Sequence, residues 1–280
     1  MAAALLRGQV WRAKRGFALI VVLWTLVLIA FIVAHLTASG RVETKIAGNL
    51  VANAQAAAAA DGAISDAVFN LTDPQPERRW PIDGSTRTIA IGATRIELRL
   101  DDEAARINPN LASPALMEAL LKAVGTDAAT ARAIAAAIAA WIGTAAPPRT
   151  AEEIAAEYRA AGRDYGPPGE PLETIDELGQ VLGVTPAVLA ALRPHLSLFA
   201  PALPNPEHAD PIIAAALAAA AKATTTAPPR PAPASNTLTV RITATAEGPG
   251  NARIARGAVI RTAPGLPEGY AILAWGSRLD

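Results

Sequence analysis

The chain has 280 residues, 51% of them hydrophobic, and its 25 Lys and Arg balance its 25 Asp and Glu to a formal net charge of zero. This balance argues against a dedicated nucleic-acid-binding protein, which would carry a basic face. Cysteine is absent, which excludes disulfides and thiol chemistry. The three histidines, His35, His195 and His208, are too far apart in sequence to form a metal-ligand motif.

The first element is a basic leader that meets an apolar segment. Four basic residues and no acidic one precede Gly16, namely Arg7, Arg12, Lys14 and Arg15. Residues 17–36 carry no formal charge and would span about 30 Å as a helix, which is enough to cross a bilayer. The leader keeps its own end cytoplasmic. Without the leader the chain has 21 Lys and Arg against 25 Asp and Glu, a net charge of −4.

The helical pattern continues beyond the apolar segment. Apolar residues recur three, four or seven positions apart at Val42, Ile46, Leu50, Ala54, Ala57, Ile64, Val68 and Leu71. A helix of about 55 residues from Phe17 would reach roughly 80 Å, and Asp73-Pro74 would end it. The sequence therefore predicts one long helix, half in the membrane and half amphipathic.

Two alternating runs come after a loop at residues 74–84. Residues 87–91 and 94–100 are separated by Gly92-Ala93, and in the second run Ile96, Leu98 and Leu100 share one face. This alternation predicts a hairpin with one solvated face. We expect the hairpin to pack on the amphipathic half of the long helix.

The period then becomes helical for about 120 residues. Helices are predicted from Ser113-Pro114 to Val124, over 128–142, from a capping pattern at Thr150–Glu153, from Thr185-Pro186 to Pro194, and over 211–222. Thr174–Glu177 repeats the capping pattern ahead of residues 178–182.

A proline-rich linker at 223–235 precedes further strands at 237–246, 252–262 and 270–275. Two strands before the helices and three after them are too few to stand alone. Joined, they form one antiparallel sheet in which the helices are an insertion. The predicted fold class is α+β.

The leader resembles the class III signal of type IV pilins and type II secretion pseudopilins. In that class a membrane peptidase cuts after the glycine and methylates the new N-terminus. The resemblance implies cleavage between Gly16 and Phe17, with methylation of Phe17 and retention of the membrane helix. The alternative is a single-pass anchor that is never cut.

Several further motifs, in this order, resemble the K-type minor pseudopilin of the type II secretion system (the GspK family) over essentially the whole chain. The matching stretches are residues 55–64, 102–113, 158–162 with 165–167, 173–178, 205–211 and 270–275. The resemblance implies a pilin-like long helix on a small sheet (residues 37–102 and 236–280), with an all-helical domain (103–222) inserted between strands.

The fifth mature residue would be Val21, where pilins generally carry a glutamate. That glutamate neutralises the N-terminal ammonium of the subunit above, and a carboxylate at this depth is costly unless it has such a role. The K-type family lacks it and is thought to cap the filament. Val21 thus separates a tip subunit from a shaft subunit, but it does not separate a pilin from an ordinary anchor.

Many K-type members bind calcium through acidic residues after the second inserted helix. Here Trp141-Ile142 is followed by Gly143, Thr144, Ala145 and Ala146, with no carboxylate. Calcium usually takes six to eight oxygen ligands, several of them acidic. The alternative is a weaker site formed by Glu152, Glu153, Glu157 and Asp164, but these residues better suit helix ends and a solvated face. We expect no metal and no other cofactor.

Residues 107–138 also resemble a helix-hairpin-helix DNA-binding unit, which would make the chain a membrane-anchored protein of a competence-type system. Its hairpin, Val124–Asp127, lacks a second glycine, carries an acid, and has only Lys122 and Arg132 close by. We therefore expect no nucleic-acid partner.

No catalytic motif is present, so an enzyme is not expected. The resemblance implies a minor pseudopilin that caps the tip of the pseudopilus and supports protein export across the outer membrane. The expected partners are the I- and J-type minor pseudopilins, joined through the spine helices and the sheet edge, with the major pseudopilin and the prepilin peptidase. The expected location is the inner membrane, single-pass, with the C-terminal body in the periplasm.

Overall fold

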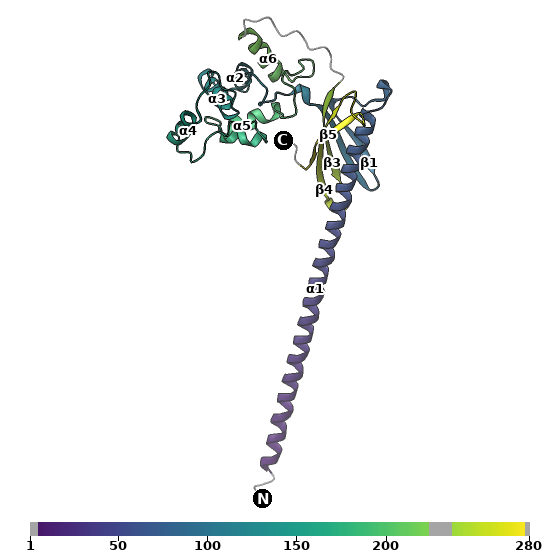
Figure 1. Ribbon diagram of the computed structural model, residues 1–280. Helices are drawn as coiled ribbons and strands as arrows, with labels where there is room; N and C mark the ends of the chain where they lie inside the picture. The colour runs from purple at the N-terminus through teal and green to yellow at the C-terminus, as the bar shows by residue number, and fades with distance from the viewer. Residues whose placement is uncertain (1–4, 224–236, 278–280) are drawn as a thin grey trace.

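The computed structural model describes residues 5–223 and 237–277 and, within the first helix, the side chains of residues 17–37 and 43–71. A long helix, α1 (Leu5–Leu71), carries a body at its far end (Figure 1). The proline-rich linker predicted at 223–235 lies almost entirely outside the described residues, as do residues 1–4 of the leader. The expected long N-terminal helix is confirmed.

The body contains a five-stranded antiparallel sheet in the order β1-β2-β3-β4-β5. The strands are β1 (Asp83–Ile91), β2 (Thr94–Asp102), β3 (Leu238–Glu247), β4 (Arg253–Thr262) and β5 (Tyr270–Gly276). β2 and β3 are paired although more than 130 residues separate them, as in Leu100↔Ile242. The predicted union of the early and late strands into one antiparallel sheet is therefore confirmed.

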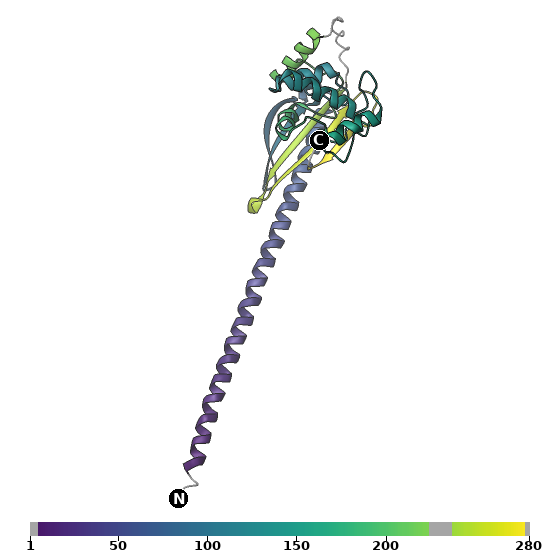
Figure 2. The same cartoon turned by 90° about the vertical axis from the view of Figure 1, so that its left-hand side faces the viewer.

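The upper part of α1 lies lengthwise against one face of this sheet (Figures 1 and 2). Its buried side is made largely of alanine, at positions 56, 59, 60, 63 and 67. Small side chains let the helix backbone approach the sheet closely, so that Ile64 and Val68 reach Ile96, Leu98 and Leu100 in a shared core. The alternation along β2 produces this core, because every second residue from Thr94 to Asp102 is buried.

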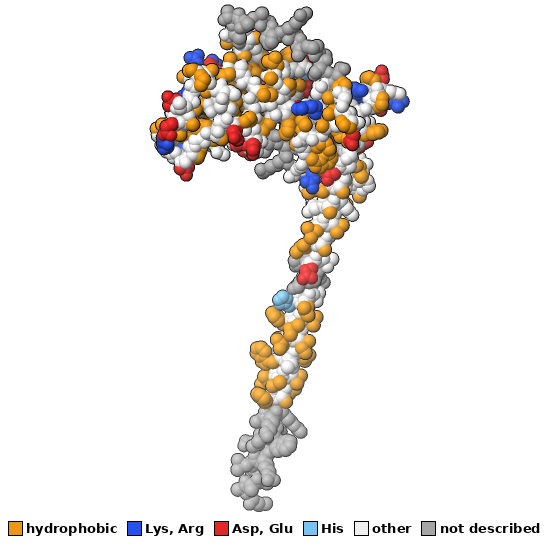
Figure 3. Space-filling view, viewed as in Figure 1, with side chains coloured by type: hydrophobic (Ala, Val, Ile, Leu, Met, Phe, Trp, Pro, Cys, Tyr) orange, Lys and Arg blue, Asp and Glu red, His pale blue; other side chains and the backbone are white. Residues whose placement is uncertain are grey.

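The lower part of the predicted apolar stripe is not covered by the body. Ile46 and Leu50 are 53% and 65% exposed, whereas from Ala56 onward the helix side that faces the sheet is buried. The sheet ends at the turn η5 (Pro249–Asn251), and a Cβ on the preceding Gly248 would lie 3.4 Å from that of Ala56. The stripe thus extends below the sheet as an exposed apolar surface on the stem, visible in Figure 3.

A series of helices lies between η2 (Glu103–Ala105), which comes directly after β2, and β3. The α-helices are α2 (Pro114–Ala123), α3 (Ala128–Trp141), α4 (Ala151–Ala160), α5 (Pro186–Leu192), which continues into the short η4 (Arg193–His195), and α6 (Pro211–Ala223). The predicted caps are present: Ser113 accepts from Leu116 N, and Thr150 and Glu153 form a capping box. The helices between η2 and β3 are called the helical block below.

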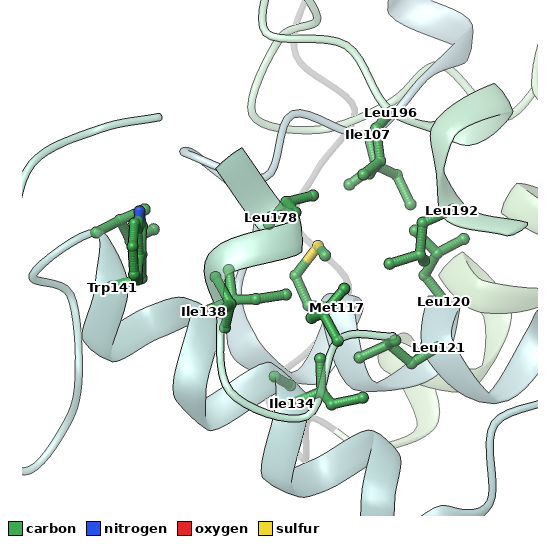
Figure 4. Close-up of a cluster of buried hydrophobic side chains, with 14 of the residues drawn as sticks. Ile107, Met117, Leu120, Leu121, Ile134, Ile138, Trp141, Leu178, Leu192 and Leu196 are labelled. Atoms are coloured by element: carbon green, nitrogen blue, oxygen red, sulfur yellow. The ribbon is translucent and has the colours of Figure 1, made fainter. Parts of the chain in front are cut away.

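The helical block has its own hydrophobic core, separate from that of the sheet. Met117, Leu120 and Leu121 of α2 meet Ile134 and Ile138 of α3 (Figure 4). Leu178, Leu192, Leu196 and Ile107 complete the same core. Because these residues come from both ends and the middle of the segment, the block packs as one unit.

The helix predicted to follow Thr174 is not a regular α-helix in the structure. The capping pattern at Thr174–Glu177 is present, but it begins a 3-10 helix, η3 (Ile175–Gln180). Gly179 lies inside that helix and Gly183 comes soon after it with φ +85°. Glycine is a poor helix former and a frequent helix terminator, so the regular helix does not continue.

Candidate functional site

The N-terminal apolar part of α1 contains all three residues that the sequence marked for processing and assembly. Gly16, Phe17 and Val21 lie in order on the same uninterrupted helix. Among the described residues, one helix is long and apolar enough to cross a membrane, at Phe17–Thr37, and none of it is buried in the protein. Val21 is 45% exposed. Its carbonyl accepts a hydrogen bond from the Thr25 hydroxyl at 2.9 Å, so the hydroxyl group of Thr25 is satisfied within the helix.

At the opposite end of the molecule, the segment after β2 ties the sheet to the helical block. The buried Asp102 carboxylate accepts from Ala104 N at 2.9 Å and lies 2.6 Å from Nδ1 of His208. The next residue, Glu103, is fully buried and is paired with Arg241 of β3. We call this pair of contacts the joint: Asp102 holds the block, and Glu103 holds the sheet.

Arg106 lies beside the same carboxylate. Its Nη1 is 3.9 Å from Glu103 Oε1. Burial lowers the pKa of the Arg106 guanidinium, and the charge of Glu103 opposes that effect. Two arginines around one buried carboxylate leave the joint with compensated charge, which a buried carboxylate requires.

Two asparagines of the motif at 102–113 connect distant segments of the helical block through hydrogen bonds. Asn108 donates through Nδ2 to the carbonyls of Leu198 and Ala200 at 2.8 and 2.9 Å. Asn110 both donates to the carbonyl of Leu172 at 2.9 Å and accepts from its amide at 2.8 Å. An asparagine side chain can do this because it carries the same donor and acceptor as a peptide group. The sequence marked this motif only by resemblance and did not reveal these partners.

A second histidine–aspartate pair stands next to the joint. His195 Nδ1 lies 2.7 Å from Asp210 Oδ2. The other oxygen of Asp210 accepts from the amides of Ile212 and Ile213 at the start of α6. Partial burial acts to raise the pKa of Asp210, but these hydrogen bonds outweigh it and hold the pKa below its ordinary value.

A cleft of about 630 Å³ lies between the end of the sheet and the segment that carries these histidines. Its charged lining includes Arg99, Asp101, Asp102, Arg106 and His208. Arg99 pairs with Asp101 at 2.7 Å and Asp102 lies 2.6 Å from His208, so these four side chains are engaged with one another in the cleft. The arrangement suits a joint between two packed parts of the chain.

The loop after Trp141 does not fit the calcium that the family resemblance implies. It is held by protein contacts: the amide of Gly169 donates to the Trp141 carbonyl at 3.1 Å and that of Thr144 to Ala139 at 2.8 Å. The Trp141 ring packs near Tyr158, with centroids 6.0 Å apart. A Cβ on Gly143 would lie only 2.7 Å from the Gly169 carbonyl oxygen, so the two backbone segments are in direct contact.

Three of the four carboxylates that the sequence places nearby are engaged elsewhere, and for Asp164 the structure gives no link to the loop. Glu152 pairs with Arg159 at 2.6 Å and Glu157 with Arg149 at 2.5 Å, while Glu153 caps α4. Across the described parts of the chain, no three His, Cys, Asp or Glu side chains group in a way that could hold a metal ion.

The hairpin between α2 and α3 likewise lacks what DNA phosphates need. The carboxylate of Asp127 accepts from the amides of Ala129 and Thr130 at 3.1 and 3.0 Å. An anion would have to displace this carboxylate from the helix N-terminus. The two basic residues nearby both pair with Glu118, Lys122 at 2.5 Å and Arg132 at 3.7 Å.

Comparison with known proteins identifies relatives of the chain. Residues 96–202 match the family model for type II secretion system protein K. The fold is similar to that of a chain in the crystal structure of the GspK-GspI-GspJ complex from the enterotoxigenic Escherichia coli type 2 secretion system, with a TM-score of 0.52 and 19% identity. The similarity covers 86% of this chain and 99% of that one. No curated protein sequence gives a significant match.

Proposed function

We propose that the chain, whose residues 96–202 match the family model for type II secretion system protein K, is a non-enzymatic minor pseudopilin that caps the tip of the pseudopilus and supports protein export across the outer membrane. The observation that carries this proposal is the position of the helical block. β2 ends and β3 begins at the end of the sheet that is farthest from the membrane segment, so the block emerges at the distal end of the molecule (Figure 1).

The shape of the block restricts where such a subunit fits. In the filament that we propose, neighbouring subunits lie side by side along their α1 helices. The block extends sideways from the sheet (Figures 1 and 2) and occupies the space that a subunit above would need. We therefore propose a pilin-like body at about 37–102 and 236–280, an inserted helical domain at about 103–222, and a position at the end of the filament.

The membrane end supports the same position. A subunit at the tip has no subunit above it whose N-terminal ammonium needs neutralising, and Val21 in place of glutamate spares the membrane helix a buried charge. We propose that the prepilin peptidase cuts between Gly16 and Phe17 and methylates Phe17. The helix at Phe17–Thr37 then anchors the protein in the inner membrane with its body in the periplasm.

The proposed partners are the I- and J-type minor pseudopilins, together with the major pseudopilin. The complex in which the similar fold occurs contains GspI and GspJ. We propose that the present chain assembles with the same two types of partner.

Deletion of the gene, with an assay of secreted proteins, tests the function. We expect export to fall and to recover when the full chain is restored. A variant without the helical block can be made by joining Asp102 to Val240 with a short turn, because these residues are register partners. This variant should still enter the membrane but should not restore tip function. Normal export without the chain would contradict the proposal.

Processing is tested separately by N-terminal sequencing of the mature protein. We expect a methylated Phe17 as the first residue, and unprocessed protein in the membrane when Gly16 is replaced by a bulky residue. A mature protein that begins at any other residue would rule out the prepilin leader.

A further inference from the structure

The two edge strands of the sheet differ in charge. β1 carries Asp83 and Arg87, and the Arg87 guanidinium lies 5.0 Å from the ring centroid of Trp80 in the preceding loop. β5, at the other edge, has the sequence YAILAWG, with neither a charge nor a proline. Charged residues, prolines and covering loops are the features that keep edge strands from pairing with other chains. β1 has such protection, and β5 has only one register irregularity, opposite Val259 and Ile260.

The outer edge of β5 carries no paired strand in the part of the chain that the structure describes. Among the described residues, no backbone hydrogen bond outside the β4–β5 pairing reaches residues 271–276. Each such edge presents a row of N–H and C=O groups that pair readily with an added strand.

Two large apolar side chains of β5 are exposed next to this edge. Ile272 and Trp275 are register partners of Ile260 and Ala258, which pack in the core beneath α1, so they lie on the same face of the sheet as α1. α1 packs mainly on β3 and β4 and also reaches β2 and β1, whereas its contact with β5 is slight at most. Ile272 and Trp275 therefore remain 53% and 43% exposed beside α1.

We propose that β5 is the docking edge for a partner: a strand of an I- or J-type minor pseudopilin adds to β5 and covers Ile272 and Trp275. This inference rests on the proposed function, which supplies the partner. An uncharged strand with β-branched or aromatic side chains on the face of the sheet that α1 packs against fits this edge, because such side chains pack well across neighbouring strands.

Two arrangements of a second copy of this chain fit the edge poorly. Antiparallel pairing of two β5 strands would turn one molecule end over end, because the strands run lengthwise beside α1 (Figures 1 and 2). The two Phe17–Thr37 segments would then point in opposite directions and could not enter one membrane. Parallel pairing of β5 with β1 of another copy would bring Asp83 and Arg87 against an uncharged edge.

The test uses the full-length processed protein in detergent with the I- and J-type pseudopilins of the same secretion system. Ile272→Lys should weaken binding of the partner by at least about tenfold, since a charge would be buried at the contact. Ile91→Lys is the matched control, because Ile91 is 41% exposed on the opposite edge strand. The control variant should bind as the wild type does.

Amide hydrogen exchange reports on strand pairing without any substitution. Addition of the partner should slow exchange within residues 270–276 by about tenfold or more and leave residues 83–91 unchanged. If the wild type binds a partner while exchange in β5 is unchanged and Ile272→Lys binds normally, the docking edge is wrong and the proposed function stands. If the wild type binds neither partner, both proposals fail.

The absence of cysteine allows the occupant of the edge to be identified. A photo-activated cross-linker attached at Ala274→Cys should join the chain to the I- or J-type pseudopilin. A cross-link to a second copy of this chain or to an exported protein would overturn the assigned occupant.

Discussion

The Asp102 carboxylate lies 2.6 Å from Nδ1 of His208, across 106 positions of the sequence. Asp102 is the last residue of β2, and His208 lies in the segment that leads into α6. This contact joins the helical block to the sheet where the block begins, and Glu103 and Arg241 secure the sheet side of the same joint. The orientation of the block on the body therefore depends on a few named side chains.

Replacement of His208 by alanine should loosen this joint. The Asp102 side chain is only 4% exposed and would lose its histidine partner, which should cost about 1–3 kcal/mol. Chemical unfolding followed by tryptophan fluorescence measures the loss, and limited proteolysis should show faster cleavage between block and sheet. Glu207→Ala is the control, since Glu207 is exposed and should change stability by less than about 0.5 kcal/mol. Equal effects of the two substitutions would contradict the role of His208.

Gly143→Ala should destabilise the helical block more than Gly162→Ala does. Both glycines have φ +74°, so an alanine at either position carries the same left-handed backbone strain, on the order of 1 kcal/mol. Only at Gly143 would the new Cβ meet another backbone atom, 2.7 Å from the Gly169 oxygen, while Gly162 faces open space. The difference between the two melting temperatures isolates the contact that closes the loop. Identical melting temperatures would mean that the loop is not held there.

Thermal unfolding should be the same in millimolar calcium and in a chelator. The loop after Trp141 contains no carboxylate, and Glu152, Glu153 and Glu157 are occupied by Arg159, the α4 N-terminus and Arg149. A ligand that bound the native state would raise the melting temperature. A calcium-dependent rise of several degrees would show that these carboxylates leave their partners and rebuild a site.

The cap at Asp210 should make the block sensitive to acid. Because the pKa of Asp210 in the folded protein lies below the ordinary value of 3.8, its ionised form is favoured in the native state. Its contribution to stability is fully present above pH 3.8 and is lost as the pH falls through the lower, folded pKa. Asp210→Asn retains a capping side chain and should remove this part of the pH dependence. Denaturant titrations at pH 7, 5 and 3 measure the free energy of unfolding. If the variant and the wild type lose the same free energy of unfolding on acidification, the acid sensitivity belongs to other groups.

Local features of the fold were predictable because their causes are local. Ser113 and Thr150 cap helices through amides three residues away, and the alternation of Ile96, Leu98 and Leu100 sets one face of a strand. The capping pattern at Thr174 was predicted equally well, but Gly179 and Gly183 restrict the helix that starts there to a short 3-10 helix. Composition alone also indicated the membrane segment at the N-terminus.

The sequence by itself determined the long helix, the strands, the uncharged span after Gly16 and, through the order of its motifs, the resemblance to the K-type family. It did not determine which side chains meet, because the contacts of Asn110 with Leu172 and of Asp102 with His208 depend on chain segments that only folding brings together. The same holds for exposure: Leu50 and Leu71 continue one apolar stripe, yet only Leu71 lies where the sheet can cover it. Burial is a property of the packed neighbours, and for Ile272 on β5 those neighbours are missing from the described chain itself.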